Sequence, residues 1–199
     1  MPINVHTYTL PPTPLIPNFP YPLLHYPGLL KETITSLTFT QIQLLDLYAA
    51  NGFGVTDAPD WAPGKYAAGE RGAAGEKGGI EIQARLGDVF VVPAGVAHKT
   101  FLPVPRSGEL AFYQPRDIAE GRAGEGGEEV ERERRRFFEG GRVQGEFMMM
   151  GAYPVGKVWD FRAGGEDQRE EVWRVRVPDR DPVLGDSEEG LVGLWREGV

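Results

Sequence analysis

The 199-residue chain contains no cysteine. This absence excludes disulfide bonds, thiolate metal sites and cysteine nucleophiles. The chain also lacks any apolar run near the roughly 20 residues that a bilayer-spanning helix requires, so we expect no membrane partner. Its first residues, M-P-I-N-V-H-T-Y, show no basic segment followed by an apolar run, which predicts a cytoplasmic protein.

Positive charge is also scarce. The chain has 21 lysine and arginine residues against 29 aspartate and glutamate residues, which gives a formal net charge of −8. An acidic surface repels the phosphate backbone of DNA and RNA, so nucleic acid is not an expected partner. Histidine is rarer still, so any imidazole chemistry is restricted to His6, His25 and His98.

Glycine and proline are abundant, with 27 and 17 residues. Both residue types favour turns, so the composition predicts many short strands in an antiparallel sandwich or barrel. Proline concentrates in residues 1–30, where it opposes a helix and predicts an extended N-terminal arm. Large apolar residues between the prolines, such as Phe19 and Leu23, indicate that the arm lies on the core.

One helix is predicted at residues 40–50, T-Q-I-Q-L-L-D-L-Y-A-A. Thr40 and Gln43 fit a capping box at its start, and Asn51-Gly52 is a typical stop. Apolar residues recur at helical spacing and predict one buried face. The predicted face consists of Ile42, Leu45 and Ala49.

Two regions predict loops rather than core elements. Residues 54–79 are rich in glycine and alanine, show no periodicity and predict one long flexible loop. Residues 120–141 contain E-E-V-E-R-E-R-R-R-F-F between glycines. Because opposite charges alternate there at helical spacing, this region predicts a solvated insertion with a short exposed helix.

Strands are predicted where apolar residues alternate with polar ones or run together. Residues 80–86 alternate strictly, which is typical of a half-buried strand. Residues 89–92 are continuously apolar and predict a strand that is buried on both faces. Further strands are predicted at residues 109–114, 147–153 and 173–177.

The stretch G-D-V-F-V-V-P-A-G-V-A-H predicts a strand that ends at a tight corner. Gly87 and Asp88 form a turn before the strand, and Pro93 ends it because proline donates no ladder hydrogen bond. Gly95 allows a positive φ in the corner. His98 then begins the next strand and is expected to point inward, where an imidazole can bind a divalent metal.

Three roles are open for His98. It is either a buried structural histidine with hydrogen-bond partners, a remnant ligand of a weak metal site, or a general base. The other two histidines, His6 and His25, lie in the proline-rich arm and are predicted to be packing or surface residues.

The spacing G-x5-P-x-G-x2-H, carried by Gly87, Pro93, Gly95 and His98, resembles the second sequence motif of the cupin superfamily. The segments L-Y-A-A-N-G-F, M-G-A-Y-P-V-G-K-V-W-D and D-P-V-L-G-D are similar, in the same order, to the YjlB-like branch of small cupins, which includes fungal members. The resemblance implies a mostly-β, cupin-like antiparallel jelly-roll barrel, here incomplete, with the N-terminal extended arm and one or two short helices. It implies a single domain over residues 1–199 and a homodimer.

The resemblance also implies a divalent metal, and here the sequence departs from the family. Metal-binding cupins carry a first motif resembling H-x-H-x3-4-E, which together with the position of His98 makes a cage of three histidines and one glutamate for Mn, Fe, Ni or Zn. No H-x-H occurs in this chain, and its expected place, between Phe53 and Ile80, is glycine-rich. Either the protein has lost its metal, or the chain lacks a coding segment of about 25 residues, two strands' worth.

These features predict a cupin-domain protein of unknown substrate that is metal-poor and catalytically inactive as it stands. Two alternatives stay open: a small-metabolite oxygenase or isomerase that uses a divalent metal held partly by His98, and a non-catalytic small-molecule-binding or structural protein. Whether the protein is an enzyme is therefore open. The predicted site consists of His98 as remnant metal ligand on a scaffold of Gly87, Asp88, Pro93 and Gly95.

Overall fold

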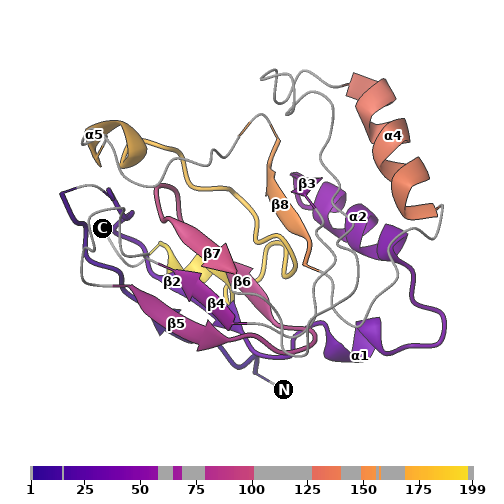
Figure 1. Ribbon diagram of the computed structural model, residues 1–199, viewed down its shortest axis with the longest axis horizontal. Helices are drawn as coiled ribbons and strands as arrows, with labels where there is room; N and C mark the ends of the chain where they lie inside the picture. The colour runs from indigo at the N-terminus through magenta and orange to yellow at the C-terminus, as the bar shows by residue number, and fades with distance from the viewer. Residues whose placement is uncertain are drawn as a thin grey trace. The chain divides into compact units, whose positions relative to one another are not determined.

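A computed structural model shows how the chain is organised (Figure 1). It describes residues 2–14, 16–57, 65–68, 79–100, 127–139, 149–155, 157 and 169–196. The chain divides into two compact units that interleave in sequence. The first unit comprises residues 1–32, 64–101 and 161–199, and the second comprises residues 33–63 and 102–160.

The first unit holds two three-stranded antiparallel sheets, in the orders β1-β2-β6 and β5-β4-β7. Two short helices, α5 (Arg169–Val172) and α6 (Leu191–Leu194), belong to the same unit. The strands are β1 (His6–Tyr8), β2 (Leu23–Tyr26), β4 (Lys65–Ala68), β5 (Ile80–Gln83), β6 (Val89–Val91) and β7 (His98–Thr100).

The two sheets face each other across one hydrophobic cluster. Its fully buried members are Leu10, Leu23 and Val96, and half-buried residues from both sheets pack against them. Since side chains alternate along a strand, the residues in this cluster mark the inner face of each sheet. The half-buried members are Tyr8, Ile80, Ile82, Ala84, Phe90 and Val92.

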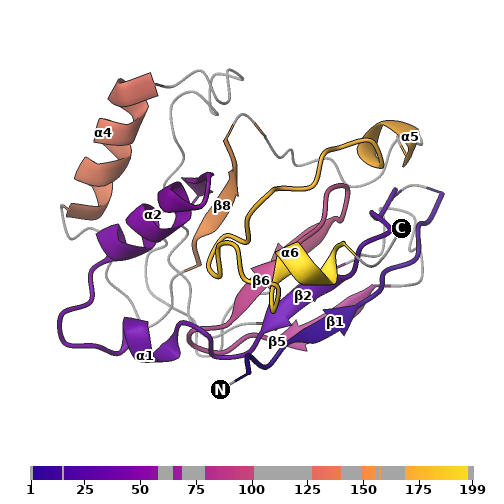
Figure 2. The same cartoon turned by 180° about the vertical axis from the view of Figure 1, so that it is seen from behind.

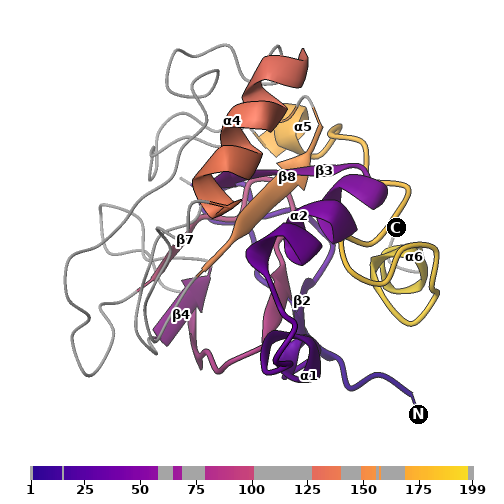
Figure 3. The ribbon, with the colours of Figure 1, turned by 90° about the vertical axis from the view of Figure 1, so that its right-hand side faces the viewer.

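The outer face of the sheet β1-β2-β6 is covered by the C-terminal segment. In Figure 3, β4, β2 and α6 follow one another across the first unit, and Figure 2 shows α6 in front of β2 and β6. The indole Nε1 of Trp195, just after α6, donates to the carbonyl oxygen of Pro22 at 2.9 Å. The C-terminal segment therefore packs on β2 through both backbone and side-chain contacts.

A buried carboxylate joins this segment to β2. Asp181 is fully shielded from solvent, and its Oδ2 accepts a 2.6 Å hydrogen bond from the Tyr26 hydroxyl. The remaining lone pairs accept from backbone N–H groups at 2.9 to 3.0 Å, so the charge is surrounded by donors. These donors belong to Val183, Leu184 and Leu191.

Among its described residues, the second unit has helices α2 and α4 and a two-stranded antiparallel sheet formed by β3 and β8. A four-residue helix, α1 (Lys31–Ile34), lies where the chain passes from the first unit into the second. The elements of the second unit are α2 (Gln41–Ala50), β3 (Phe53–Asp57), α4 (Gly127–Glu139) and β8 (Gly151–Pro154).

Helix α2 begins and ends as predicted. At its start the Gln43 side chain accepts a hydrogen bond from the Thr40 N–H at 3.0 Å, which is one half of the capping box. At its end Gly52 has a φ of 83°, the left-handed conformation that stops a helix. The predicted buried face is wrong in part, because Ala49 is exposed. The buried residues are Leu44, Leu45 and Tyr48.

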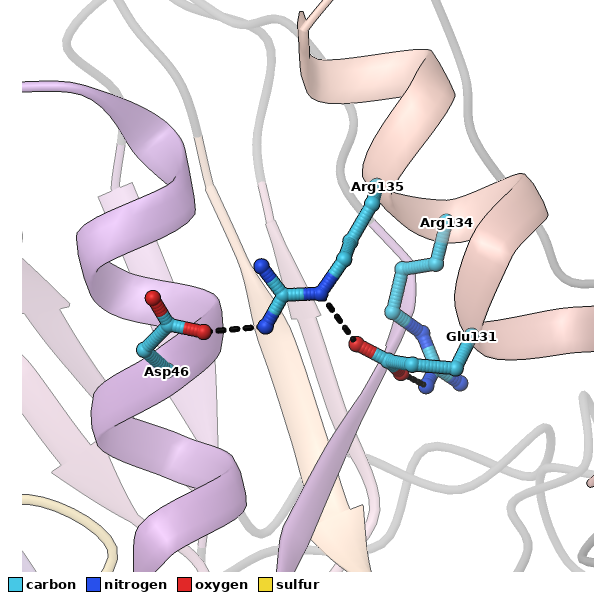
Figure 4. A network of polar contacts seen from close by, with 4 residues as sticks. All are labelled: Asp46, Glu131, Arg134 and Arg135. Atoms are coloured by element: carbon cyan, nitrogen blue, oxygen red, sulfur yellow. Dashed lines mark hydrogen bonds and ion pairs between the residues drawn. The ribbon is translucent and has the colours of Figure 1, made fainter. Parts of the chain in front are cut away.

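Helix α4 confirms the predicted charged helix and packs against α2. Figure 4 shows Asp46 of α2 in an ion pair with Arg135 of α4, while Glu131 accepts from both Arg134 and Arg135. Phe138 near the end of α4 is buried, so one side of the helix is packed and not solvated. Burial of Phe138 should stabilise the packed position of α4 more than these ion pairs do, because exposed ion pairs contribute little.

Burial of Tyr48 in α2 predicts a loss of stability in alkaline solution. Desolvation raises the pKa of Tyr48 to about 12, so the folded protein keeps this proton at a pH where the unfolded chain has lost it. The contribution of the Tyr48 hydroxyl to the free energy of unfolding is fully present below pH 10. It falls by about 2–3 kcal/mol as the pH rises from 10 to 12. Urea unfolding at pH 9, 10 and 11 should show a smaller decline for Tyr48→Phe than for the wild type. Equal declines would contradict the prediction.

Several other sequence predictions can be compared with the strands. The strand at residues 89–92 is confirmed by β6, and the strand at residues 80–86 is confirmed over Ile80–Gln83, since residues 84–87 leave the strand and turn. The prediction of a flexible loop at residues 54–79 is wrong for the described part of that region. Strands β3 and β4 lie there and pair with distant strands. The strand at 173–177 is also wrong, because Trp173 forms a turn after α5 and its indole donates to the arm at Pro17.

The predicted strand at 109–114 lies outside the described residues, as do the ends of the region 120–141. The part of the chain that is described has several antiparallel strands and a few helices, and these strands do not close into a barrel. The jelly roll therefore stays a prediction. The single domain over residues 1–199 also stays a prediction, while the structure divides the chain into two compact units.

Candidate functional site

The turn before β6 is locked to the end of the N-terminal arm. Gly87 has a φ of 82°, and its carbonyl oxygen accepts from the N–H of Leu30 at 2.9 Å. A Cβ atom at this position would lie 2.3 Å from the backbone nitrogen of Lys31. Glycine is thus required both by the backbone angle and by the neighbouring chain.

Asp88 holds three segments of the first unit together. Its Oδ1 accepts from the N–H of Gly28 at 2.8 Å, and its Oδ2 accepts from the N–H of Arg85 at 3.0 Å. The same Oδ2 lies 3.1 Å from Nε2 of His25 on β2. The carboxylate therefore fixes the turn, the arm and one imidazole at once.

The corner after β6 is a hydrogen-bonded turn, in which the N–H of Val96 donates to the carbonyl oxygen of Pro93 at 3.4 Å. Gly95 has a φ of 68°, the positive value predicted from the sequence, and its carbonyl oxygen accepts from the N–H of Asn18. A Cβ on Gly95 would lie 2.4 Å from the Val172 side chain. The N-terminal arm and α5 therefore pack closely against the corner that precedes His98.

His98 is the first residue of β7, as predicted. It pairs with Ala68 of β4, and Ala68 pairs on its other side with Ile80 of β5. Directly paired residues point to the same side of a sheet, so His98 shares the inner face with Ile80. The residue is nevertheless exposed, which differs from the expectation of a buried structural histidine.

The other two histidines form a row with Phe90 across the sheet β1-β2-β6. His6 pairs with His25, and His25 pairs with Phe90. The rings of His25 and Phe90 stack, with centroids 4.5 Å apart, and the His6 ring meets His25 edge-on at 5.5 Å. Because Phe90 belongs to the inner cluster, this row lies on the inner face.

Comparison with known proteins gives one relative of nearly equal length. It is the uncharacterised protein YjlB of Bacillus subtilis, which is 25% identical over 202 residues, with 96% of this chain and 97% of the relative covered. The chain is similar to YjlB along almost its whole length. No family model matches the chain, and no solved structure matches it.

The ligand chemistry of the described residues is limited. Within them, no group of three or more His, Asp or Glu side chains is placed to hold a metal ion. None of the helices that the structure describes is long and apolar enough to cross a membrane. The predicted role of His98 as a remnant metal ligand therefore stays a prediction.

Sequence reasoning missed the association of His25 with Asp88. The two residues are 63 positions apart, and nothing in the local pattern of the arm distinguishes His25 from a packing residue. One signal was available, since L-L-H-Y is an apolar run interrupted by a single imidazole. A polar group in such a run is expected to need a buried partner.

Proposed function

We propose that the protein is a cupin-like binding protein that takes a small organic molecule on the inner faces of the two sheets of its first unit, without a tightly held metal. His98 is the polar contact for this ligand. The observation that carries the proposal is the position of His98, which shares a face with Ile80 and is still exposed. An accessible imidazole beside apolar side chains suits a small molecule of mixed polarity.

The rigid corner before β7 supports this role. The turn at Pro93 and the contacts of Gly95 with the arm and α5 hold the start of β7 at a fixed point on the sheet. An imidazole on a strand that begins at such a corner is preorganised, so little conformational entropy is lost when it binds a ligand. In this proposal His98 only binds and orients the ligand and takes no part in a reaction.

A second candidate is a metal-dependent oxygenase or isomerase of a small metabolite. It is favoured by the same inner-face position of His98, because an imidazole there is a suitable ligand for Fe, Mn, Ni or Zn. One imidazole does not hold a divalent ion, since the number and geometry of the ligands set the affinity. The second candidate therefore requires further ligands beyond those that the described residues bring to His98.

Metal analysis together with ligand-observed NMR separates the two candidates. Purified wild-type protein is expected to carry less than about one tenth of an equivalent of Fe, Mn, Ni or Zn at the His98 site, with the same content in His98→Ala. A library of small hydroxy acids, sugars and aromatic acids is expected to give binders that His98→Ala weakens at least about tenfold. Glu81→Ala, on the opposite face of β5, is the matched control and should bind normally.

Two results decide against this proposal. Near-stoichiometric metal that is lost in His98→Ala would establish the second candidate instead. Ligands that bind His98→Ala and the wild type equally would remove His98 from the site.

A further inference from the structure

All three histidines of the chain belong to the inner faces of the two sheets of the first unit. His98 shares its face with Ile80 on one sheet. On the other sheet His6 and His25 lie in one row with Phe90, a member of the inner cluster. His6 and His98 are exposed, and His25 is buried. The two accessible imidazoles of the chain therefore lie on the faces where the proposed ligand binds.

The inner-face residues around these imidazoles carry no charge. Across its own sheet, His98 is followed by Ala68 and then by Ile80. The inner cluster is apolar except for the phenol of Tyr8. Glu81 lies between Ile80 and Ile82 on β5, so it takes the opposite face. Within the described strands of the first unit, no Lys, Arg, Asp or Glu occupies an inner-face position, so histidine is the residue type there that changes charge near neutral pH.

Asp88, in the turn before β6, is the acidic residue that contacts this face, through His25. Its two oxygens already accept hydrogen bonds from the N–H groups of Gly28 and Arg85, at 2.8 and 3.0 Å. The Asp88 side chain is only 5% exposed. Because its lone pairs are engaged and its surface is covered, this carboxylate is not placed to bind a cationic ligand.

We propose that the small molecule bound at His98 is an organic acid, whose carboxylate accepts a hydrogen bond from the protonated imidazole. This inference rests on the function proposed above and names the class of its ligand. A hydrogen bond from a cationic donor to a carboxylate is about twice as strong as one between neutral groups. The apolar side chains that share the inner faces, such as Ile80 and Phe90, suit the hydrocarbon part of the acid.

The same residues argue against other charged ligands. An amine would give up its hydration on these faces, where the described strands supply no carboxylate to balance its charge. A phosphate is usually bound by arginine, lysine or a helix N-terminus, and the inner-face positions of the described strands hold neither of those two residues. A carboxylate carries a single charge, which one protonated imidazole balances.

Binding of an acid at His98 is expected to depend on pH. An ordinary imidazole has a pKa of about 6.5, and an ordinary carboxylic acid has a pKa of about 4. Between pH 6 and 8.5 the ligand therefore stays ionised while the imidazole loses its charge. The affinity for an acid should be highest at pH 6 and should fall as the pH rises, whereas a neutral amide of the same shape should bind equally across the range.

The test is calorimetric titration of the full-length protein at pH 6.0, 7.0 and 8.5 with three pairs of probes: benzoate and benzamide, phenylacetate and phenylacetamide, and lactate and lactamide. At least one acid is expected to bind about tenfold or more tightly at pH 6.0 than at pH 8.5, with no such change for its amide. His98→Gln keeps a hydrogen-bond donor without the charge, so it should bind the acid weakly and equally at each pH. Glu81→Gln removes a charge from the opposite face of β5 and should keep the wild-type profile.

His98 is exposed, so its replacement should leave the fold intact, and thermal melts at the three pH values check this. Equal binding of the acids at pH 6.0 and 8.5 would overturn the proposal, as would a pH dependence that persists in His98→Gln. If acids and amides bound alike and His98→Ala weakened both, the ligand site at His98 would stand and the organic-acid class would fail. If no probe bound the wild type, or if no replacement of His98 altered binding, the proposed function would fail as well.

Discussion

Replacement of Gly87 by alanine is expected to destabilise the first unit by about 3–5 kcal/mol. A positive φ costs a residue with a Cβ roughly 1–2 kcal/mol. The larger cost comes from the contact with Lys31, because the new Cβ would lie 2.3 Å from its nitrogen and 2.5 Å from its Cα. Both are backbone atoms next to the hydrogen bond from Leu30, so they cannot move without breaking it.

Gly28→Ala is the matched control for this prediction. Gly28 also has a positive φ, 65°, and lies in the same unit, but its nearest neighbour to a new Cβ is 4.0 Å away. Gly28→Ala should therefore lose only the roughly 1–2 kcal/mol of stability that a positive φ costs a residue with a Cβ. Urea unfolding followed by tryptophan fluorescence measures both variants. A Gly87→Ala variant as stable as Gly28→Ala would show that the contact between the turn and α1 is not rigid.

Replacement of Asp181 by alanine is expected to cost about 3–5 kcal/mol, because several buried donors lose their only described acceptor. The carboxylate is fully buried and accepts from the Tyr26 hydroxyl and from the N–H of Leu191, among others. These bonds connect the C-terminal segment to β2. The variant should thus lose the packing of α6 on the sheet as well as global stability.

Two variants control for the Asp181 prediction. Tyr26→Phe removes one donor and leaves the backbone donors paired, so it should cost about 1–2 kcal/mol. Asp179→Ala removes a carboxylate that is 77% exposed and pairs with Arg176, so the change should be below about 0.5 kcal/mol. Urea unfolding of the three variants ranks them. If Asp181→Ala lost no more stability than Asp179→Ala, the buried carboxylate would not join the segment to β2.

Much of the local structure could be predicted from the sequence, because it depends on neighbours along the chain. The capped start of α2 at Thr40 follows from the side chain three residues later. The alternation at residues 80–86 predicts β5, and the corner at Gly95 follows from the conformational freedom of glycine. In each case the signal and the structure lie within a few residues of each other.

Elements that depend on distant partners were not predicted. Strand β4 lies in glycine-rich sequence and exists because it pairs with β5 and β7, and β3 exists because it pairs with β8. Conversely, the alternating residues after Trp173 are not a strand, because the indole is held by carbonyl groups of the arm. The periodicity of apolar residues along the chain does not indicate which segments pair in the folded structure.

The strand, the corner and the following strand that lead to His98 follow from the local sequence, since glycine and proline restrict the backbone wherever the rest of the chain lies. The surroundings of each histidine, in contrast, depend on the folded structure. It placed Asp88 against His25 and left His98 exposed on an inner face. The physical reason is that hydrogen bonding and burial of a side chain depend on groups that folding brings together from positions far apart in sequence.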